Sequence, residues 1–273
     1  MVQRVAFFVY GAACYLIFLA TFLYAIGFVG NLVVPKGLDS PPAQPFGPAL
    51  AIDALLLGVF AVQHSVMARP WFKKSWTRLV PWTIERSTYV LCASAALALL
   101  MWQWRPLGGQ VWTVESAPAR ALLYALFASG WLLVLYATFL INHFDLFGLR
   151  QVWLQLRGKP YSHLGFGTPG PYRLVRHPLY LGFICAFWAT PQMTVTHLVF
   201  ALATTMYILV AIQLEERDLL REHGESYATY RRDVPMLLPW RRQRAGGATE
   251  TAAVKARTLG PLAPEGLPPE ERR

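Results

Sequence analysis

The sequence predicts an all-α membrane protein, a polytopic helix bundle with about six crossings in which the last two form a helical hairpin. Of its 273 residues, 55% are hydrophobic and 15% are charged, whereas soluble domains carry about 25% charged residues. Apolar runs long enough to cross a hydrocarbon core of about 30 Å recur along the chain. The 25 Lys and Arg residues outnumber the 15 Asp and Glu residues, and they cluster between these runs.

Four apolar runs each have the length of one crossing. Val5–Gly30 contains no charged side chain. Arg4 precedes this run, as in a signal peptide, but the run exceeds the 7–15 apolar residues of such a peptide, so we interpret it as a span. The other three runs are 49–67, 87–104 and 121–142.

The fifth apolar run, 179–214, is about twice as long as one crossing needs. Pro191 lies near its middle, and proline removes an N–H group and breaks the helix before it. We therefore expect a helical hairpin here. A single long kinked helix is the alternative.

The distribution of Lys and Arg predicts the orientation, because cytoplasmic loops carry the excess of these residues. Two loops and the segment after the last span hold most of them: Arg69, Lys73, Lys74, Arg78, Arg86; Arg150, Arg157, Lys159, Arg173, Arg176; and Arg217, Arg221, Arg231, Arg232, Arg241, Arg242, Arg244. The other loops contain only Lys36, Arg105 and Arg120. Both termini are therefore expected in the cytoplasm.

Two domains are expected from composition. Residues 1–240 would form the transmembrane domain. Residues 241–273 are rich in Ala, Gly, Pro, Glu and Arg, and such a segment buries too little apolar surface to offset its ordering entropy. We expect a disordered, basic and proline-rich cytoplasmic tail.

Polar groups at membrane depth are costly and therefore mark candidate sites. Four predicted helix ends deliver such groups to the cytoplasmic side: His64; His143 with Asp145; Arg176 with His177; and Glu215 with Glu216. Each one alone is also explained by snorkelling to the headgroups, so the hypothesis of a site rests on their convergence. Asp53 lies near the opposite surface, where we expect a structural hydrogen bond.

The segment 168–182 is the most informative one. It places Arg173, Arg176 and His177 just before a membrane helix, and Pro178 is suited to its first turn. A helix N-terminus attracts carboxylates and phosphates. Either an anionic lipid headgroup or the carboxylate of a soluble cofactor fits this pattern.

Several other classes of protein are disfavoured. Cys14, Cys92 and Cys185 are far apart, so no zinc site or redox pair is expected, and we expect no metal. Residues 165–170 match GxGxxG, but no strand precedes them and prolines interrupt them, so a loop that can fold over a ligand is favoured over a dinucleotide site. Nucleic-acid binding is not expected, because topology explains the basic residues.

Two motifs at the C-terminal end carry a resemblance. Arg-His-Pro-Leu-Tyr-Leu-Gly at 176–182, and Glu-Glu-Arg-Asp-Leu at 215–219 followed by Tyr227, Tyr230, Val234 and Pro235, resemble the isoprenylcysteine carboxyl methyltransferase superfamily of membrane enzymes. Segments 63–67, 84–89, 102–106 and 142–150 are similar, more narrowly, to bacterial members that methylate methanethiol. The similarity covers about Val5 to Pro239.

The resemblance implies a thiol methyltransferase that uses S-adenosylmethionine and forms dimethyl sulfide. It implies a cofactor site at the cytoplasmic ends of the helices, formed by Tyr172, Arg173, Arg176, His177, Tyr180, Glu215 and Glu216. A thiol with a pKa of about 8.5 is mostly protonated at pH 7, so a base is needed. His64 and His143 are the candidate bases, and Asp145 is a candidate to orient one of them.

Other readings remain open at this stage. The acceptor can be a prenylcysteine carboxylate, a larger thiol or a lipid, although a carboxylate needs no base. A sterol-reductase-like NADPH enzyme shares this C-terminal architecture. From a different class, His64 and His143 suit the axial ligands of a haem, whereas a transporter is disfavoured because the polar groups avoid the midplane. The sequence does not define the oligomeric state.

Overall fold

The computed structural model describes residues 1–162 and 165–240. The chain divides into a compact unit, Met1–Pro239, and a second unit, Trp240–Arg273. The predicted tail, residues 241–273, lies outside the described residues. The description below concerns the first unit.

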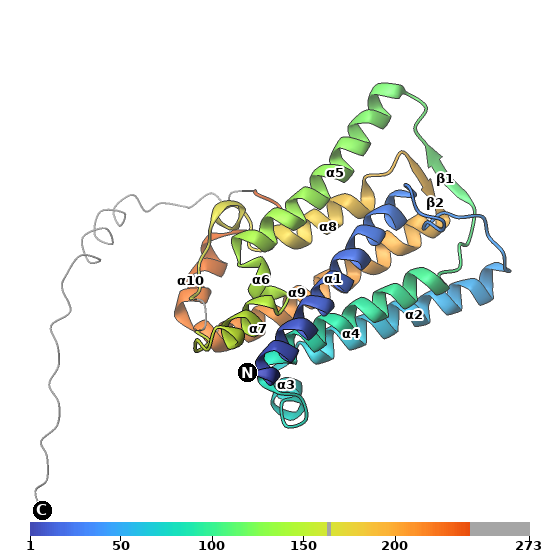
Figure 1. The fold of residues 1–273 in the computed structure, drawn as a ribbon. Helices are drawn as coiled ribbons and strands as arrows, with labels where there is room; N and C mark the ends of the chain where they lie inside the picture. The colour runs from blue at the N-terminus through green and yellow to red at the C-terminus, as the bar shows by residue number, and fades with distance from the viewer. Residues whose placement is uncertain (163–164, 241–273) are drawn as a thin grey trace, which may run out of the picture. The chain divides into compact units, whose positions relative to one another are not determined.

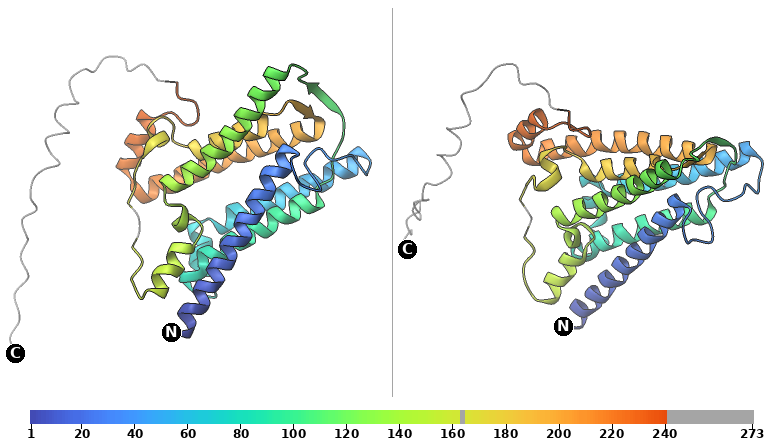
Figure 2. Two further views of the ribbon diagram at one scale, coloured as in Figure 1. Left: turned by 45° about the horizontal axis from the view of Figure 1, so that its top comes forward. Right: turned by 90° about the horizontal axis from the view of Figure 1, so that it is seen from above.

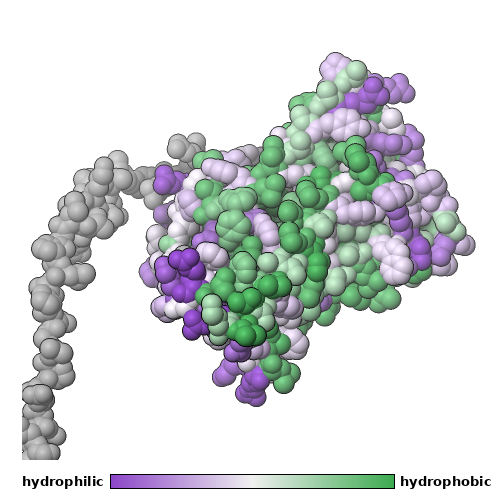
Figure 3. Space-filling view, viewed as in Figure 1, coloured by the Kyte–Doolittle hydropathy of each residue, from purple (hydrophilic) through white to green (hydrophobic). Residues whose placement is uncertain are grey.

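Five helices are long and apolar enough to cross a membrane (Figures 1 and 2). They are α1 (Val2–Gly30), α2 (Phe46–Met67), α4 (Trp82–Gln103), α5 (Ala117–Leu140) and α9 (Val195–His223). At 1.5 Å per residue, even a helix of 22 residues is about 33 Å long. Apolar side chains cover the middle of the bundle, and polar ones gather toward its ends (Figure 3). The predicted polytopic helical bundle is confirmed.

Shorter elements connect and follow the spans. They are α3 (Pro70–Trp76), α6 (His143–Leu146), α7 (Leu149–Leu156), the 3-10 helix η1 (Gly170–Arg173), α8 (Pro178–Trp188) and α10 (Glu225–Asp233). Helices α3, α6, α7 and α10 lie at the same end of the bundle as the N-terminus (Figure 1). This end carries the basic loops, and we call it the basic end.

The fifth apolar run folds as two helices, α8 and α9, and not as one kinked helix. Pro178 is the first residue of α8, as its sequence position predicts. With 11 residues, however, α8 is about 17 Å long, shorter than a hydrocarbon core. The segment expected to form a sixth crossing therefore consists of a short helix followed by extended chain.

A small two-stranded sheet accompanies the helices. Strand β1 (Gln110–Thr113) pairs antiparallel with β2 (Gln192–Thr194) at the end opposite the basic end (Figure 1). Gly108 and Gly109 precede β1 with positive φ angles of 72° and 68°, a conformation that glycine adopts without strain. Strands of four and three residues are too short to leave a clear periodic signal.

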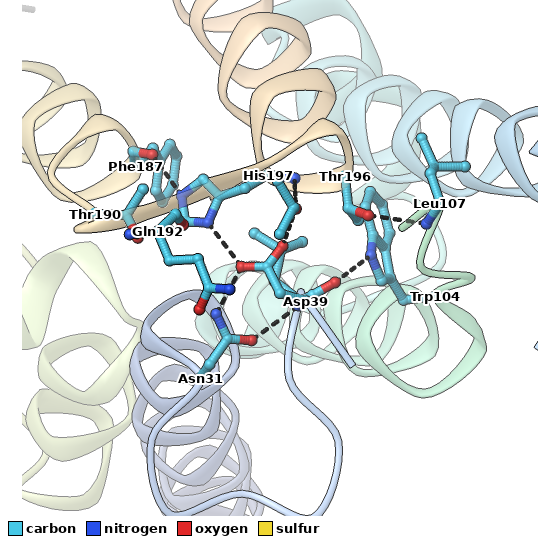
Figure 4. A network of polar contacts seen from close by, with 11 residues as sticks. Asn31, Asp39, Trp104, Leu107, Phe187, Thr190, Gln192, Thr196 and His197 are labelled. Atoms are coloured by element: carbon cyan, nitrogen blue, oxygen red, sulfur yellow. Dashed lines mark hydrogen bonds and ion pairs between the residues drawn. The ribbon is translucent and has the colours of Figure 1, made fainter. Parts of the chain in front are cut away.

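A polar network around the buried His197, seen in Figure 4, stabilises this opposite end. His197 Nδ1 lies 3.1 Å from Asp39 Oδ2, and its Nε2 lies 2.8 Å from the carbonyl oxygen of Phe187. In an uninterrupted helix that carbonyl would bond the N–H of residue 191, which is a proline without an N–H group. Asn31 Nδ2 donates to Asp39 Oδ2 at 2.7 Å, and the Thr194 hydroxyl donates to Asp39 Oδ1. The network ties the loop after α1 to the α8–α9 turn.

Asp53 has the structural role expected from its position. Its side chain is fully buried, and its Oδ1 accepts a hydrogen bond of 2.8 Å from the backbone N–H of Arg105.

Close contact between α5 and α8 positions the Arg-His-Pro segment. A Cβ atom added at Gly182 would lie 2.7 Å from the carbonyl oxygen of Gly130, and one added at Gly130 would lie 2.7 Å from the carbonyl oxygen of Gly182. Two glycines therefore let the backbones approach, as small residues do in membrane helix pairs. Trp131 packs edge-to-face against Phe183 and Phe187 beside this contact.

Candidate active site

Glu216 is the centre of a buried ion-pair cluster at the basic end. Its side chain is 3% exposed. Its Oε1 lies 2.7 Å from Arg176 Nε and 3.1 Å from His177 Nε2, and its Oε2 lies 3.1 Å from Arg231 Nε. Charge-assisted hydrogen bonds of this kind are strong and directional. The cluster joins the start of α8 to α9 and α10.

The Arg-His-Pro segment also pairs with the chain that follows α10. The backbone N–H groups of Arg176 and His177 donate to the carbonyls of Pro235 and Met236, at 2.9 and 3.1 Å. The Arg176 guanidinium donates to the carbonyl oxygens of Arg231, at 2.9 Å, and Val234. Arg176 and His177 are therefore held by internal partners, which limits what they can offer to a ligand.

Glu215 is differently placed from its neighbour. It is half-buried, and its Oε2 accepts a hydrogen bond of 2.8 Å from the Tyr180 hydroxyl. Among the described residues its Oε1 has no hydrogen-bond partner. Tyr180 in turn packs against the ring of His177, with ring centroids 5.6 Å apart. Glu215 thus presents a free oxygen beside an aromatic ring.

Tyr172 and Arg173 lie on the loop side of this carboxylate. Burial and the nearby Glu215 carboxylate raise the pKa of the Tyr172 phenol, so it remains a neutral hydrogen-bond donor. The carbonyl oxygen of Tyr172 accepts a hydrogen bond of 2.6 Å from Tyr230, and burial raises the pKa of Tyr230 to about 12. Arg173 is exposed, which leaves its guanidinium accessible.

Tyr227 carries a buried hydroxyl that lacks a partner within the described ranges. The residue is 1% exposed, and Glu216 and Glu215 are among the charged groups near its phenol. Phe166, from the glycine-rich loop, packs edge-to-face on its ring with centroids 5.7 Å apart. A buried hydroxyl without a partner carries a desolvation cost, which a ligand with an acceptor atom would remove.

His64 lies in a second group of rings contributed by α2, α4 and α9. The Tyr89 hydroxyl is 3.1 Å from His64 Nδ1 and 3.2 Å from Nε2. The Tyr89 hydroxyl can donate to the carbonyl oxygen of His64 at 3.4 Å. Its oxygen then accepts from the N–H of the imidazole, and the other ring nitrogen keeps a free lone pair. Phe60 stacks on the imidazole, with centroids 5.3 Å apart and an interplanar angle of 15°.

This group connects to the Glu215 helix through polar contacts. The Ser65 hydroxyl lies 3.1 Å from the Tyr207 hydroxyl, and Arg69 forms an ion pair of 2.8 Å with Asp218. Both contacts join the end of α2 that lies at the basic end to α9. The phenols of Tyr207 and Tyr89 are in turn neighbours of the Tyr180 phenol. The structure thus brings His64, Tyr180 and Glu215 into one aromatic and polar layer.

His143 lies in a separate aromatic cluster. Its Nε2 is 2.8 Å from the Tyr15 hydroxyl, and its Nδ1 is 2.9 Å from the Thr138 hydroxyl. Its ring stacks on Phe139 with centroids 4.3 Å apart. Burial lowers the pKa of His143. Both nitrogens are therefore occupied in a ring that is 4% exposed.

The sequence suggested Asp145 as a residue that could orient a histidine. The structure does not bring Asp145 to the His143 ring. Asp145 Oδ1 forms an ion pair of 2.9 Å with Arg150, and Oδ2 accepts from Tyr161 at 3.3 Å. Its carboxylate instead joins α6 to α7 and to the loop that follows. The physical reason is the short α6, whose Asn142 cap accepts from the Asp145 N–H at 3.1 Å and orients Asp145 toward that loop.

Sequence reasoning did not foresee the contacts of four aromatic residues of the candidate site. Tyr89 belongs to a motif that was noticed, but its contact with His64 was not foreseen. Phe60 and Tyr207 lie inside apolar runs, where no local pattern distinguishes them from core residues. Tyr227 was noticed only through the resemblance. Within residues 1–162 and 165–240, no three His, Cys, Asp or Glu side chains are placed to hold a metal ion.

Comparison with known proteins agrees with this architecture. Residues 119–225 match the phospholipid methyltransferase family, a range that runs from α5 through the Arg-His-Pro segment into α10. With five apolar helices of membrane-crossing length, the chain is an integral membrane methyltransferase. No solved structure matches it.

Named relatives define the family more closely. Methanethiol S-methyltransferase of Mycobacterium tuberculosis is 60% identical over 232 residues, which cover 85% of this chain and 95% of the relative. The protein of the same name from Crocosphaera subtropica is 58% identical, with 85% and 91% covered. Methanethiol S-methyltransferase 2 of Bradyrhizobium diazoefficiens is 52% identical, with 88% and 92% covered. The chain therefore belongs to the methanethiol S-methyltransferase family.

Proposed function

We propose that this protein transfers a methyl group from S-adenosylmethionine to methanethiol and releases dimethyl sulfide. The observation that carries the proposal is the layer in which His64, with one free ring nitrogen, and Glu215, with one free oxygen, are connected by tyrosines. The names of the relatives support the choice of acceptor.

The groups around Glu215 fit the methyl donor. When bound, S-adenosylmethionine supplies an electrophilic methyl group on a cationic sulfur. The free oxygen of Glu215 accepts from the ribose diol, and the exposed guanidinium of Arg173 binds the donor carboxylate. The Tyr180 ring attracts the sulfonium by cation–π interaction, and the buried Tyr227 hydroxyl gains an acceptor. Arg176, His177 and Glu216 hold this frame together through their own ion pairs.

His64 is proposed as the base. Its free nitrogen takes the proton of the thiol, and the sulfur forms a bond to the methyl carbon as the bond between that carbon and the donor sulfur breaks. The products are dimethyl sulfide, S-adenosylhomocysteine and a protonated His64, which returns its proton to water. His143 is proposed to position α6 against α1 and α5, because both of its nitrogens are occupied.

The membrane setting supports this chemistry. The charges of a thiolate and a sulfonium neutralise each other as the methyl group transfers. A site that excludes water therefore raises the free energy of the charged reactants more than that of the transition state, which lowers the barrier. We propose that the basic end faces the cytoplasm of a bacterial inner membrane and that both termini lie there, because this end carries most of the Lys and Arg residues.

The function is tested by gas chromatography of the headspace above membranes that contain the protein. Membranes given methanethiol and S-adenosylmethionine are expected to release dimethyl sulfide, and membranes that lack either substrate or the protein are not. Absence of dimethyl sulfide from membranes with folded protein would contradict the proposal.

Single variants distinguish the roles of the two histidines. His64→Gln is expected to lower kcat by about 10²-fold or more, the range of general base catalysis, with donor affinity unchanged. His143→Gln is expected to retain most of kcat wherever it folds. A His64→Ala/His143→Ala double variant that binds the donor and turns over at the wild-type rate would show that neither histidine takes part in the chemistry.

A further inference from the structure

We propose that Phe60 and Tyr207 set the size of the thiol that this protein accepts, by enclosing the space beside His64 with two immobilised rings. The inference rests on the proposed function and goes beyond it by assigning residues to acceptor selectivity. Neither residue needs to touch the donor.

Phe60 covers one face of the base. Its ring lies nearly parallel to the imidazole, one helical turn away on α2. Tyr89 approaches the same imidazole from α4, at 5.4 Å between ring centroids. We place the acceptor sulfur at the free nitrogen of His64, along the edge of the imidazole and beside these two rings.

Tyr207 closes the side of this space that faces α9. Its hydroxyl is fixed by the Ser65 hydroxyl at 3.1 Å, and its ring meets Phe60 edge-to-face with centroids 6.3 Å apart. Because the phenol is anchored at its tip and the ring packs against Phe60, moving it aside breaks both contacts. Tyr180, beyond Tyr207, carries the surface proposed for the sulfonium. The acceptor thus lies between an aromatic wall and the donor.

Two hollows of the bundle lie away from the base. An apolar groove of about 520 Å³ opens beside Phe127 and Trp131, and a polar one of about 230 Å³ lies beside Asn31 and Asp39 at the opposite end. Neither hollow is lined by His64, Phe60 or Tyr207. Acceptor size is therefore assigned to the rings that are in contact around the base, Phe60 with His64 and Tyr207 with Phe60.

Substrate competition tests the inference. One methylene group in a hydrophobic pocket changes selectivity by about 10- to 200-fold. The wild-type protein is expected to prefer methanethiol to propanethiol by at least about tenfold in kcat/KM for the same reason. Phe60→Ala and Tyr207→Ala are each expected to lower this ratio by about tenfold or more, through a gain with propanethiol.

Matched controls come from the same helices. Val62→Ala and Met206→Ala change apolar side chains that are 63% and 67% exposed, and both are expected to keep the wild-type ratio. Where an alanine variant does not fold, Phe60→Leu and the milder Tyr207→Phe, which removes only the contact with Ser65, replace it. Donor binding and thermal unfolding of each variant verify the fold.

The outcomes separate the two proposals. A folded Phe60 or Tyr207 variant with the wild-type chain-length preference would overturn the assignment of acceptor selectivity, while wild-type activity with methanethiol leaves the proposed function standing. A wild-type protein that methylates neither thiol but binds the donor would overturn the proposed function and this inference with it. A wild-type protein that favours propanethiol would overturn the inference alone.

Discussion

Arg176 Nε lies 2.7 Å from Glu216 Oε1, and this ion pair joins the segment just before α8 to the part of α9 at the basic end. The two side chains are 10% and 3% exposed. We therefore propose different tasks for the adjacent residues Glu216 and Glu215. Glu216 holds the site together through its ion pairs, and Glu215 meets a ligand with its free oxygen.

Replacing Glu216 tests the first of these tasks. Glu216→Gln leaves Arg176 buried without a counter-charge, and breaking a buried pair in this way costs about 3 kcal/mol. We expect a lower midpoint in denaturant or thermal unfolding of the detergent-solubilised protein. Glu222→Gln, at an exposed position of the same helix, is the control and should unfold as the wild type does. An unchanged midpoint together with lost donor binding would show that Glu216 is a ligand contact.

Replacing Glu215 is expected to have the opposite profile. Glu215→Gln keeps a hydrogen-bond acceptor for Tyr180 but removes the charge, so donor affinity should fall by about tenfold while the unfolding midpoint stays constant. Calorimetric titration with S-adenosylhomocysteine measures the affinity. Tyr180→Phe is the companion variant, because it removes the bond to Oε2 without touching Oε1. Wild-type affinity for S-adenosylhomocysteine in Glu215→Gln would show that the ribose binds elsewhere.

The buried His143 is expected to make the stability of the folded protein depend on pH. Because burial lowers its pKa in the folded protein, the unfolded chain binds the proton more readily below its own pKa of about 6.5. Stability from the neutral ring is present above that pH and is lost as the pH falls toward the lowered pKa of the folded state. His143→Gln should weaken the dependence of the unfolding midpoint on pH below pH 6.5. Identical curves for wild type and His143→Gln would contradict this account.

Replacing Asp39 is expected to lower stability without affecting the chemistry at the other end of the bundle. Asp39→Ala leaves the donors of Asn31, Thr194 and His197 without their acceptor, at a cost of about 2 kcal/mol. The unfolding midpoint should fall while KM for both substrates stays at its wild-type value in the folded fraction. Glu115→Ala, an exposed position near β1, is the control. A changed KM for the donor would indicate that the two ends of the bundle are coupled.

The membrane spans could be predicted because hydropathy alone determines them. The observed α2 and α5 begin three and four residues before the predicted runs, at Phe46 and Ala117, since polar and proline residues join a first helical turn without changing mean hydropathy. The short α8 was not foreseen. Its length depends on where Pro191 stops it and on a histidine that receives the freed carbonyl, which is a tertiary contact.

The candidate site was predicted in its residue types and only in part in its pairings. Consecutive residues on a helix point about 100° apart, so Glu215 and Glu216 face different neighbours, but the sequence does not say which one meets Arg176. In the same way, His64 and His143 look alike as interfacial histidines. Only the structure gives one a free nitrogen and the other two hydroxyl partners.

The most direct test of the central claim uses protein reconstituted in vesicles, methanethiol, and S-adenosylmethionine with a deuterated methyl group. Mass spectrometry of the headspace should detect dimethyl sulfide that carries the label, at the same rate for wild type and Met206→Ala and at least about 10²-fold more slowly for His64→Gln. Label that appears in lipid or in another acceptor, with no labelled dimethyl sulfide, would contradict the claim.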